Sequence, residues 1–260
     1  MRIYSWNVLY ENKTFEDVYT YLQKLDFDVI ALQEVPQDFL DKLKTLPYAV
    51  HESYDWVYRD ATGTEVPIYV VFVSKMPVFD THIIRFPEEL YETENQLPRA
   101  QLFRKLMGWS TFFRSKTALR ISLDVRGKAV HLYSIHLSVL RPHDRKIEFE
   151  TVVKNLDPNA LSILCGDFNV FESPQANLLN VLMGGSFGDF VYLKRERNWF
   201  EKRFKELGFV NPLRRKKTHP VAWSQIDHIL VPENTPVLEK RIIKETHGSD
   251  HNPVMVSVEL

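Results

Sequence analysis

The sequence predicts an α/β fold in which strands and helices form layers within one domain. Eight short runs have the alternating or continuously apolar pattern of strands, and helix-like runs fall between them. The 260 residues are 44% hydrophobic, which is enough to bury a sizeable core without disulfides. No linker-like stretch divides the chain. We therefore expect residues 1–260 to form a single domain.

The predicted elements alternate along the whole chain. The strand-like runs cover residues 2–8, 28–35, 67–74, 118–125, 129–137, 160–167, 225–231 and 253–260. The helix-like runs cover residues 14–25, 144–156 and 198–207. Thr14 is a good N-cap for the first helix, and Gly208 stands where a C-cap glycine would end the last one. Strands mixed with helices in this way favour a layered α/β arrangement.

The net charge of −1 hides an uneven distribution of charged residues. Residues 1–98 hold eight basic and seventeen acidic residues, whereas residues 194–217 hold ten basic and three acidic ones. A second basic segment, residues 99–120, has six basic residues and no acid. We expect the irregular stretches 86–117 and 184–219, which carry these clusters, to be long loops or small excursions. Such clusters raise the local concentration of anions, although a plain solvated face remains the alternative.

Several classes of protein are disfavoured by what the sequence lacks. No stretch approaches the roughly 20 apolar residues of a membrane span, and the first residues have the pattern of a strand rather than of a signal peptide. Cys165 is the only cysteine, so no disulfide forms within the chain. No P-loop or dinucleotide fingerprint is present. We expect a cytoplasmic protein.

Polar residues recur where the predicted strands end. The clearest case is Gly166-Asp167-Phe168-Asn169, which follows an apolar run, and a buried carboxylate is costly unless a cation or hydrogen-bond partner compensates it. Polar side chains in comparable places are Asn7, Glu34, His136, Asp227 and Ser249-Asp250-His251. Each of them alone would more often be structural. Their recurrence is informative because α/β folds gather their sites at strand ends.

The order of these motifs resembles that of the endonuclease/exonuclease/phosphatase superfamily, which includes deoxyribonuclease I and exonuclease III. The matching stretches are SWNV (5–8), ALQEV (31–35), SIHL (134–137), GDFN (166–169), QIDHIL (225–230) and SDHNPV (249–254). Motif matches are hypotheses that the structural context must support. The resemblance implies a four-layer α/β sandwich with two central, mainly antiparallel β-sheets flanked by helices.

The resemblance also implies a metal site. Glu34 matches the metal-binding glutamate of the superfamily, Asp250 matches a second acidic ligand, and Asn7 would lie beside the metal, directly or through water. Oxygen ligands of this kind suit Mg²⁺, with Mn²⁺ as a possible substitute.

The other matching positions carry implied catalytic roles. Asp227 and His251 resemble an acid–histidine pair that activates water or steadies the phosphate. Asp167 would position the nucleophile or manage a proton, and Asn169 would orient the phosphate or nucleophile. His136 matches a histidine of the deoxyribonuclease and sphingomyelinase branches, which contacts phosphate and protonates the leaving oxygen. We expect the remaining histidines, including His219, to have structural or surface roles.

The substrate stays open at this point, because members of the superfamily cleave DNA, RNA, protein–DNA adducts, inositol phosphates and sphingomyelin. We expect a metal-dependent phosphodiesterase acting on nucleic acid, as a monomer without a stable protein partner. Arg214 and Arg215 would bind additional phosphates, and the aromatic residues of 99–116 would stack on bases, contact a membrane or pack in a small core. The alternatives are a phosphatase or phosphodiesterase of lipid or small-molecule phosphates, and a catalytically silent binding protein.

Overall fold

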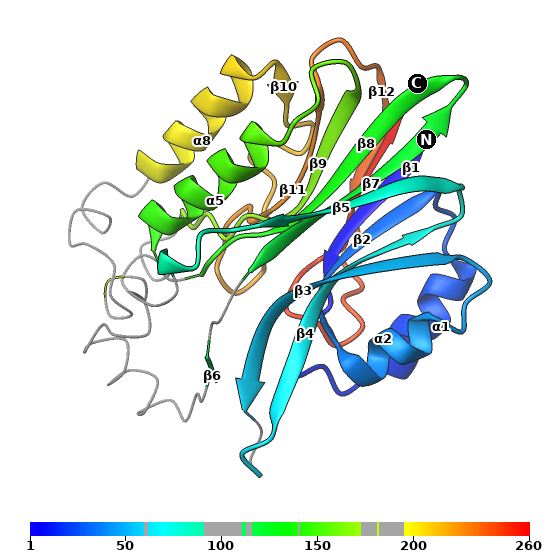
Figure 1. Ribbon diagram of the computed structural model, residues 1–260, viewed down its shortest axis with the longest axis vertical. Coiled ribbons are helices and arrows are strands. Elements are labelled where there is room, and N and C mark those ends of the chain that lie inside the picture. Colours follow the sequence, from blue (N-terminus) through cyan, green and yellow to red (C-terminus); the bar gives the residue numbers. More distant parts are fainter. Residues whose placement is uncertain (60–61, 91–110, 113–115, 140, 173–180, 182–194) are drawn as a thin grey trace.

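Two β-sheets pack face to face between two layers of helices in this computed structural model (Figure 1). The structure describes residues 1–59, 62–90, 111–112, 116–139, 141–172, 181 and 195–260. The four layers predicted through the family resemblance are therefore present, and both sheets are mainly antiparallel.

The first sheet has the strand order β12-β13-β1-β2-β4-β3-β6. Among its described strands, only β1 and β2 pair in parallel. Its strands are β1 (Arg2–Asn7), β2 (Val29–Pro36), β3 (Ala49–Arg59), β4 (Glu65–Ser74), β6 (Thr111–Phe112), β12 (Val237–Ile242) and β13 (Val254–Val258).

The second sheet has the order β10-β11-β9-β8-β7-β5. In the part of this sheet that the structure describes, only β8 and β9 pair in parallel. Its strands are β5 (Val78–Arg85), β7 (Thr117–Val125), β8 (Lys128–His136), β9 (Leu161–Asp167), β10 (Phe209–Val210) and β11 (Asp227–Pro232).

Helices cover the outer face of each sheet (Figure 1). Helices α1 (Phe15–Lys24) and α2 (Gln37–Leu43) bury Val18, Phe39 and other apolar residues against the first sheet. Helices α5 (Pro142–Lys154) and α8 (Arg195–Glu206) bury Phe149, Phe200 and their neighbours against the second sheet. A third cluster lies between the sheets and includes the fully buried Cys165, as its apolar surroundings in the sequence indicate. Burial of apolar surface is the main driving force for this layering.

The structure extends the predicted set of elements. All eight predicted strands and all three predicted helices are present, with ends shifted by a few residues. The sequence did not reveal β3, β5, β6, β10, β12 or the short helix α2. Strand β5 is an edge strand exposed along most of its length, so it lacks the alternation that marks a half-buried strand.

Two predicted helix ends have different outcomes. Gly208 follows α8 with a φ of +73°, as expected of a C-cap glycine. Thr14 stands at the N-cap of α1, but its hydroxyl donates to the carbonyl of His247 at 2.6 Å and makes no capping bond. Residues 91–110 and 113–115, which hold most of the first basic segment, and residues 184–194, which include Lys194 of the second, lie outside the described residues. Among the described helices, none is long and apolar enough to cross a membrane.

The two parallel strand pairs bring their carboxyl ends to the same end of the sandwich. Strand β1 is joined to β2 through α1, and β8 is joined to β9 through α5. Asn7 is the last residue of β1, His136 the last of β8 and Asp167 the last of β9. A hydrogen bond between Asn7 and Asp167 links the two sheets at this end.

Candidate active site

Asn7 joins the polar groups of the two sheets. Its Nδ2 donates to Glu34 Oε1 at 3.0 Å and to Asp167 Oδ2 at 3.1 Å. Its Oδ1 accepts the N–H of Leu9 at 3.0 Å, which fixes the orientation of the amide. Asn7 is 1% exposed, so these bonds hold two carboxylates together away from bulk water.

Glu34 occupies an irregular position in β2. Its φ is +57°, and the pairing of β2 with β4 shifts register between Leu32 and Val35. Non-glycine residues rarely adopt this conformation, and such irregularities are common beside active sites. The bulge turns the carboxylate toward Asn7 and the backbone N–H of Tyr10, which donates to Oε2 at 3.3 Å. Burial raises the pKa of Glu34 more than nearby His136 and Asn7 lower it.

Asp167 lies at the centre of the cluster. Its Oδ1 accepts the backbone N–H of Asn169 at 2.8 Å, and its Oδ2 accepts the bond from Asn7. Burial and the neighbouring Asp227 raise its pKa, against the opposing effect of His251. Asn169, with a φ of +52°, donates its side-chain amide to the carbonyl of Leu137 at 2.9 Å. Its side chain thus holds the turn after β9.

Asp227 and His251 form the acid–histidine pair that the sequence indicated. The two oxygens of Asp227 lie 3.0 and 3.1 Å from His251 Nδ1. Thr218 Oγ1 accepts the backbone N–H of Asp227 and fixes the start of β11. Burial alone would lower the pKa of His251, but Asp227 and Asp167 outweigh it and raise the value to about 10. The opposite ring nitrogen, Nε2, lies 3.7 Å from Asp167 Oδ2.

A second acid–histidine pair lies on the other side of Asp167, and the sequence analysis missed its carboxylate. His136 Nδ1 bonds to Asp55 Oδ2, and its Nε2 lies 3.8 Å from Asp167 Oδ2 and 3.7 Å from Glu34 Oε1. Asp55 is fully buried and also faces the ammonium of Lys116 at 3.7 Å. Burial and Lys116 oppose a charge on His136, but Asp55 and Asp167 outweigh them and raise its pKa.

Asp250 has a partner that sequence reasoning had assigned to a structural or surface role. His219 Nε2 lies 3.3 Å from Asp250 Oδ2, while the backbone N–H of Ala222 donates to His219 Nδ1 at 3.0 Å. A neutral imidazole that accepts at Nδ1 carries its proton on Nε2, so His219 donates to Asp250. Although burial acts to raise the pKa of Asp250, the bond from His219 and the charge of His251 hold it below its usual range.

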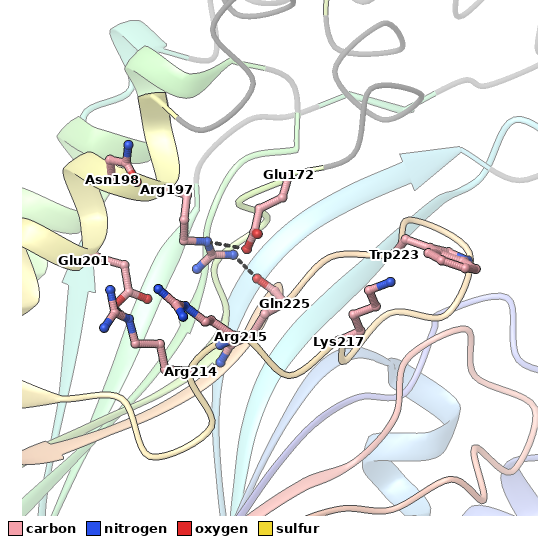
Figure 2. A pocket seen from close by; sticks show the side chains of 9 residues that line it. All are labelled: Glu172, Arg197, Asn198, Glu201, Arg214, Arg215, Lys217, Trp223 and Gln225. Carbon is pink, nitrogen blue, oxygen red and sulfur yellow. Dashed lines mark hydrogen bonds and ion pairs between the residues drawn. The ribbon is translucent and has the colours of Figure 1, made fainter.

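The structure separates Arg214 and Arg215 from this cluster. Both line a neighbouring pocket, and Arg214 Nε lies 2.9 Å from Glu201 Oε2 (Figure 2). The predicted residues that do converge are joined by a chain of contacts through Asp167 and His251. They are Asn7, Glu34, His136, Asp167, Asn169, Asp227, Asp250 and His251.

The donor set fits a hard divalent cation. Within the described residues, His219, Asp250 and His251 form one group whose ligand atoms lie within 4.8 Å of one another, and Asp167, Asp227 and His251 form another. Burial raises the pKa of Glu34 and of Asp167, and an adjacent cation would favour both charged forms. His136 Nε2 is buried without a hydrogen-bond partner in the described part of the chain, beside the oxygens of Glu34 and Asp167. Carboxylate oxygens are ligands that Mg²⁺ prefers, whereas the amide of Asn7 presents its N–H groups to Glu34 and Asp167.

Comparison with solved structures finds the same fold in proteins of low sequence identity. One is an endonuclease/exonuclease/phosphatase from Beutenbergia cavernae, with 17% identity, a TM-score of 0.71 and coverage of 100% of this chain and 71% of that one. The 3' phosphatase NExo from Neisseria, bound to a product DNA hairpin, has 18% identity, a TM-score of 0.64 and full coverage of both chains. A mannosyl-6-phosphatase from Bacteroides thetaiotaomicron has 14% identity, a TM-score of 0.60 and full coverage of both.

Sequence comparison gives the family directly. A search of curated proteins found no match. The family model described as the Endonuclease/Exonuclease/phosphatase family matches residues 4–251, nearly the whole chain. It spans every stretch on which the polar cluster is built, from Asn7 to His251. The chain therefore belongs to the endonuclease/exonuclease/phosphatase family, whose members are hydrolases that act on phosphoester bonds.

Proposed function

We propose that the protein is a Mg²⁺-dependent phosphodiesterase that cleaves nucleic acid as a monomer, with Mn²⁺ as a substitute ion. One observation carries the proposal: two imidazoles flank a single buried carboxylate. His136 and His251 each have Nδ1 held by a carboxylate of their own and Nε2 within 3.8 Å of Asp167 Oδ2. This arrangement places proton donors and an acceptor around one small volume, as hydrolysis of a phosphoester requires.

Glu34 and Asp250 are the proposed ligands of the cation, and Asn7 orients Glu34. His219 is a positioning residue, because its N–H holds Oδ2 of Asp250 while Oδ1 lies on the side of His251, 3.8 Å from its Nε2. When bound, the ion would neutralise charge on the phosphoryl oxygens.

Asp167 and His136 each carry out one proton transfer of the proposed reaction. Asp167, whose raised pKa suits a general base, accepts a proton from the attacking water as its oxygen bonds to phosphorus. The bond between phosphorus and the leaving oxygen breaks, and that oxygen takes the Nε2 proton of His136. Asp55 favours the protonated form of His136 and fixes its ring. The imidazolium of His251 stabilises charge on the phosphoryl group, supported by Asp227.

Nucleic acid is the substrate class that the surroundings of the site support best. The basic residues 214–217 directly precede Thr218 and His219, which contact the catalytic elements. Exposed cations bind the repeated phosphates of a nucleic acid more strongly than a single phosphate. NExo is described in complex with product DNA, whereas the mannosyl-6-phosphatase acts on a sugar phosphate, so the fold alone leaves the class open.

The test is a hydrolysis screen with single- and double-stranded DNA, RNA, phosphoinositides, sphingomyelin and a sugar phosphate. Wild type runs beside Asp167→Asn and the control Asp17→Asn, which alters an exposed carboxylate at the start of α1. We expect oligonucleotide cleavage that EDTA abolishes and Mg²⁺ restores, a loss of about 100-fold or more in Asp167→Asn, and full activity in the control. Cleavage that persists in EDTA, or that Asp167→Asn leaves intact, would refute the mechanism. A preference for the lipid or sugar phosphates would refute the substrate class.

A further inference from the structure

A pocket beside the active site contains an exposed aromatic ring and two cations that pair with no carboxylate of the described residues. We name it the Trp223 pocket; its volume is about 340 Å³, within the range of pockets that hold small ligands. Its lining includes Arg197, Arg214, Arg215, Lys217, Trp223 and Gln225 (Figure 2).

Two of the pocket's arginines are already neutralised. Arg197 is buried, and its guanidinium pairs with Glu172 at 2.7 Å and donates to the carbonyls of Val170 and Gln225. Arg214 pairs with Glu201 at 2.9 Å. Both ion pairs belong to the wall of the pocket and hold its shape.

Arg215 and Lys217 remain available for an anion. Within the described residues no carboxylate pairs with either side chain, and both are exposed. The backbone N–H of Arg215 donates to Gln225 Oε1 at 3.1 Å, which fixes the loop at the edge of the pocket. The pocket therefore has a net positive charge.

Trp223 is unusual because a large apolar ring is held in solvent. It is 66% exposed, and Lys217 Nζ lies 3.7 Å from its ring centroid, in a cation–π contact. Trp223 has a φ of +50° and Arg215 a φ of +65°, which non-glycine residues adopt rarely. Strained backbone of this kind clusters at ligand-binding positions. Figure 2 shows Trp223 and Lys217 together at one side of the pocket, across from Arg214 and Glu201.

Hydrogen bonds hold the loop that carries Lys217 and Trp223 against neighbouring elements. The backbone N–H of Glu172 donates to Ser224 Oγ at 2.9 Å, next to Trp223. Thr218, which follows Lys217, accepts the N–H of Asp227 at 3.0 Å. The loop that lines the pocket is therefore hydrogen-bonded to the start of β11, where Asp227 of the polar cluster lies.

We propose that the Trp223 pocket binds one unpaired nucleotide of a single-stranded nucleic acid, next to the nucleotide whose phosphate is cleaved. The base stacks on Trp223, and its phosphate contacts Arg215 and Lys217. The proposal rests on the proposed function and adds to it a preference for unpaired strands. A planar ring beside phosphate-binding cations is the combination by which proteins hold single strands, because every base has a face that can stack.

The test measures the affinity of the full-length protein for a labelled single-stranded oligonucleotide in EDTA, by fluorescence anisotropy. A second oligonucleotide carries the same phosphates but abasic sites in place of its bases. Trp223→Ala should weaken binding of the normal strand about 10-fold and should remove the wild-type preference for it over the abasic strand. Trp223→Phe should keep most of that preference. Lys217→Gln should reduce the slope of log affinity against log salt by about 0.7, as expected for one lost phosphate contact on a single strand.

Matched controls separate stacking from general changes of the loop or its charge. Val221→Ala alters a residue of the same loop that is 82% exposed, and Lys240→Gln removes an exposed lysine on β12. Both should bind like the wild type. Equal affinity of Trp223→Ala and Val221→Ala, or no preference for the normal strand in the wild type, would overturn the proposal. Oligonucleotide cleavage in the screen above would then leave the proposed function standing. Binding to phosphoinositide vesicles and not to oligonucleotides would overturn both.

Discussion

Gly166→Ala should impair the active site, although Gly166 has no side chain that could contact a substrate. Gly166 lies in β9 with a φ of +139°, and a Cβ placed on it would lie 1.8 Å from the carbonyl oxygen of Ile135 in the adjacent β8. Real Cβ atoms essentially never lie closer than 3.0 Å to such an atom. To reach that distance, the Cβ and the carbonyl oxygen would have to move apart by 1.2 Å. The next residues along these strands, His136 and Asp167, are paired in register.

Such a displacement would separate the imidazole of His136 from the carboxylate of Asp167, now 3.8 Å apart. A misplacement of about 1 Å can cost roughly 100-fold in rate. The overpacking and the positive φ together should cost about 2–5 kcal/mol of stability. We would measure kcat on the substrate identified in the hydrolysis screen, and the free energy of unfolding in urea.

Gly127→Ala is the matched control, because Gly127 has a φ of +80° in the turn between β7 and β8 but nothing within 4 Å of its Cβ position. It should lose only about 1–2 kcal/mol, the cost of a left-handed conformation, and it should keep its activity. If Gly166→Ala behaved like this control in both measurements, the close approach of β8 and β9 would have no role in positioning the site.

Three further predictions concern the histidines. Asp55→Asn should lower kcat by about 100-fold in steady-state assays, because His136 loses the partner that favours its protonated form. An unchanged kcat would exclude this role of Asp55. His219→Phe should weaken Mg²⁺ binding about 10- to 100-fold in isothermal titration calorimetry. His219→Gln, which keeps a hydrogen-bond donor, should bind Mg²⁺ more like the wild type. Equal Mg²⁺ affinities of His219→Phe and the wild type would contradict the positioning role of His219. Burial and Arg197 hold the pKa of His228 well below 6.5, so the unfolded chain takes up a proton first and stability falls as the pH drops. Between pH 7.5 and 5.5 wild type should lose about 1.4 kcal/mol more than His228→Gln in urea unfolding, and parallel losses would show that His228 does not contribute.

The sequence predicted the elements that have a clear hydrophobic pattern. Strands β8 and β9 are buried on both faces and stand out as apolar runs, and the polar residues that follow them mark the end of the sandwich where the site lies. Strand β12 is exposed or half-buried along its length, so nothing in its residues distinguished it from a loop. The four layers came from the order of the motifs and not from periodicity, because periodicity does not say which faces pack together.

The convergence of the polar residues was predictable where they belong to motifs, and it was not predictable for Asp55 and His219, which contact those residues. Asp227 and His251 stand in such motifs, and the structure brings them into contact. Asp55 lies in β3 between Tyr54 and Trp56, and an acid enclosed by aromatics was the only signal for it. His219 follows four basic residues and looked like part of an exposed loop, because sequence order does not reveal the turn that directs it to Asp250.

The hydrogen bonds from Asn7 to Glu34 and Asp167 cross from one sheet to the other. Neither half of the sandwich holds a working set of groups, since Glu34 and Asp55 belong to the first sheet whereas His136 and Asp167 belong to the second. The rate of hydrolysis therefore depends on correct docking of the two sheets. A fragment or a loosened variant that kept native secondary structure would be inert, and regained catalysis during refolding would time the docking of the two sheets.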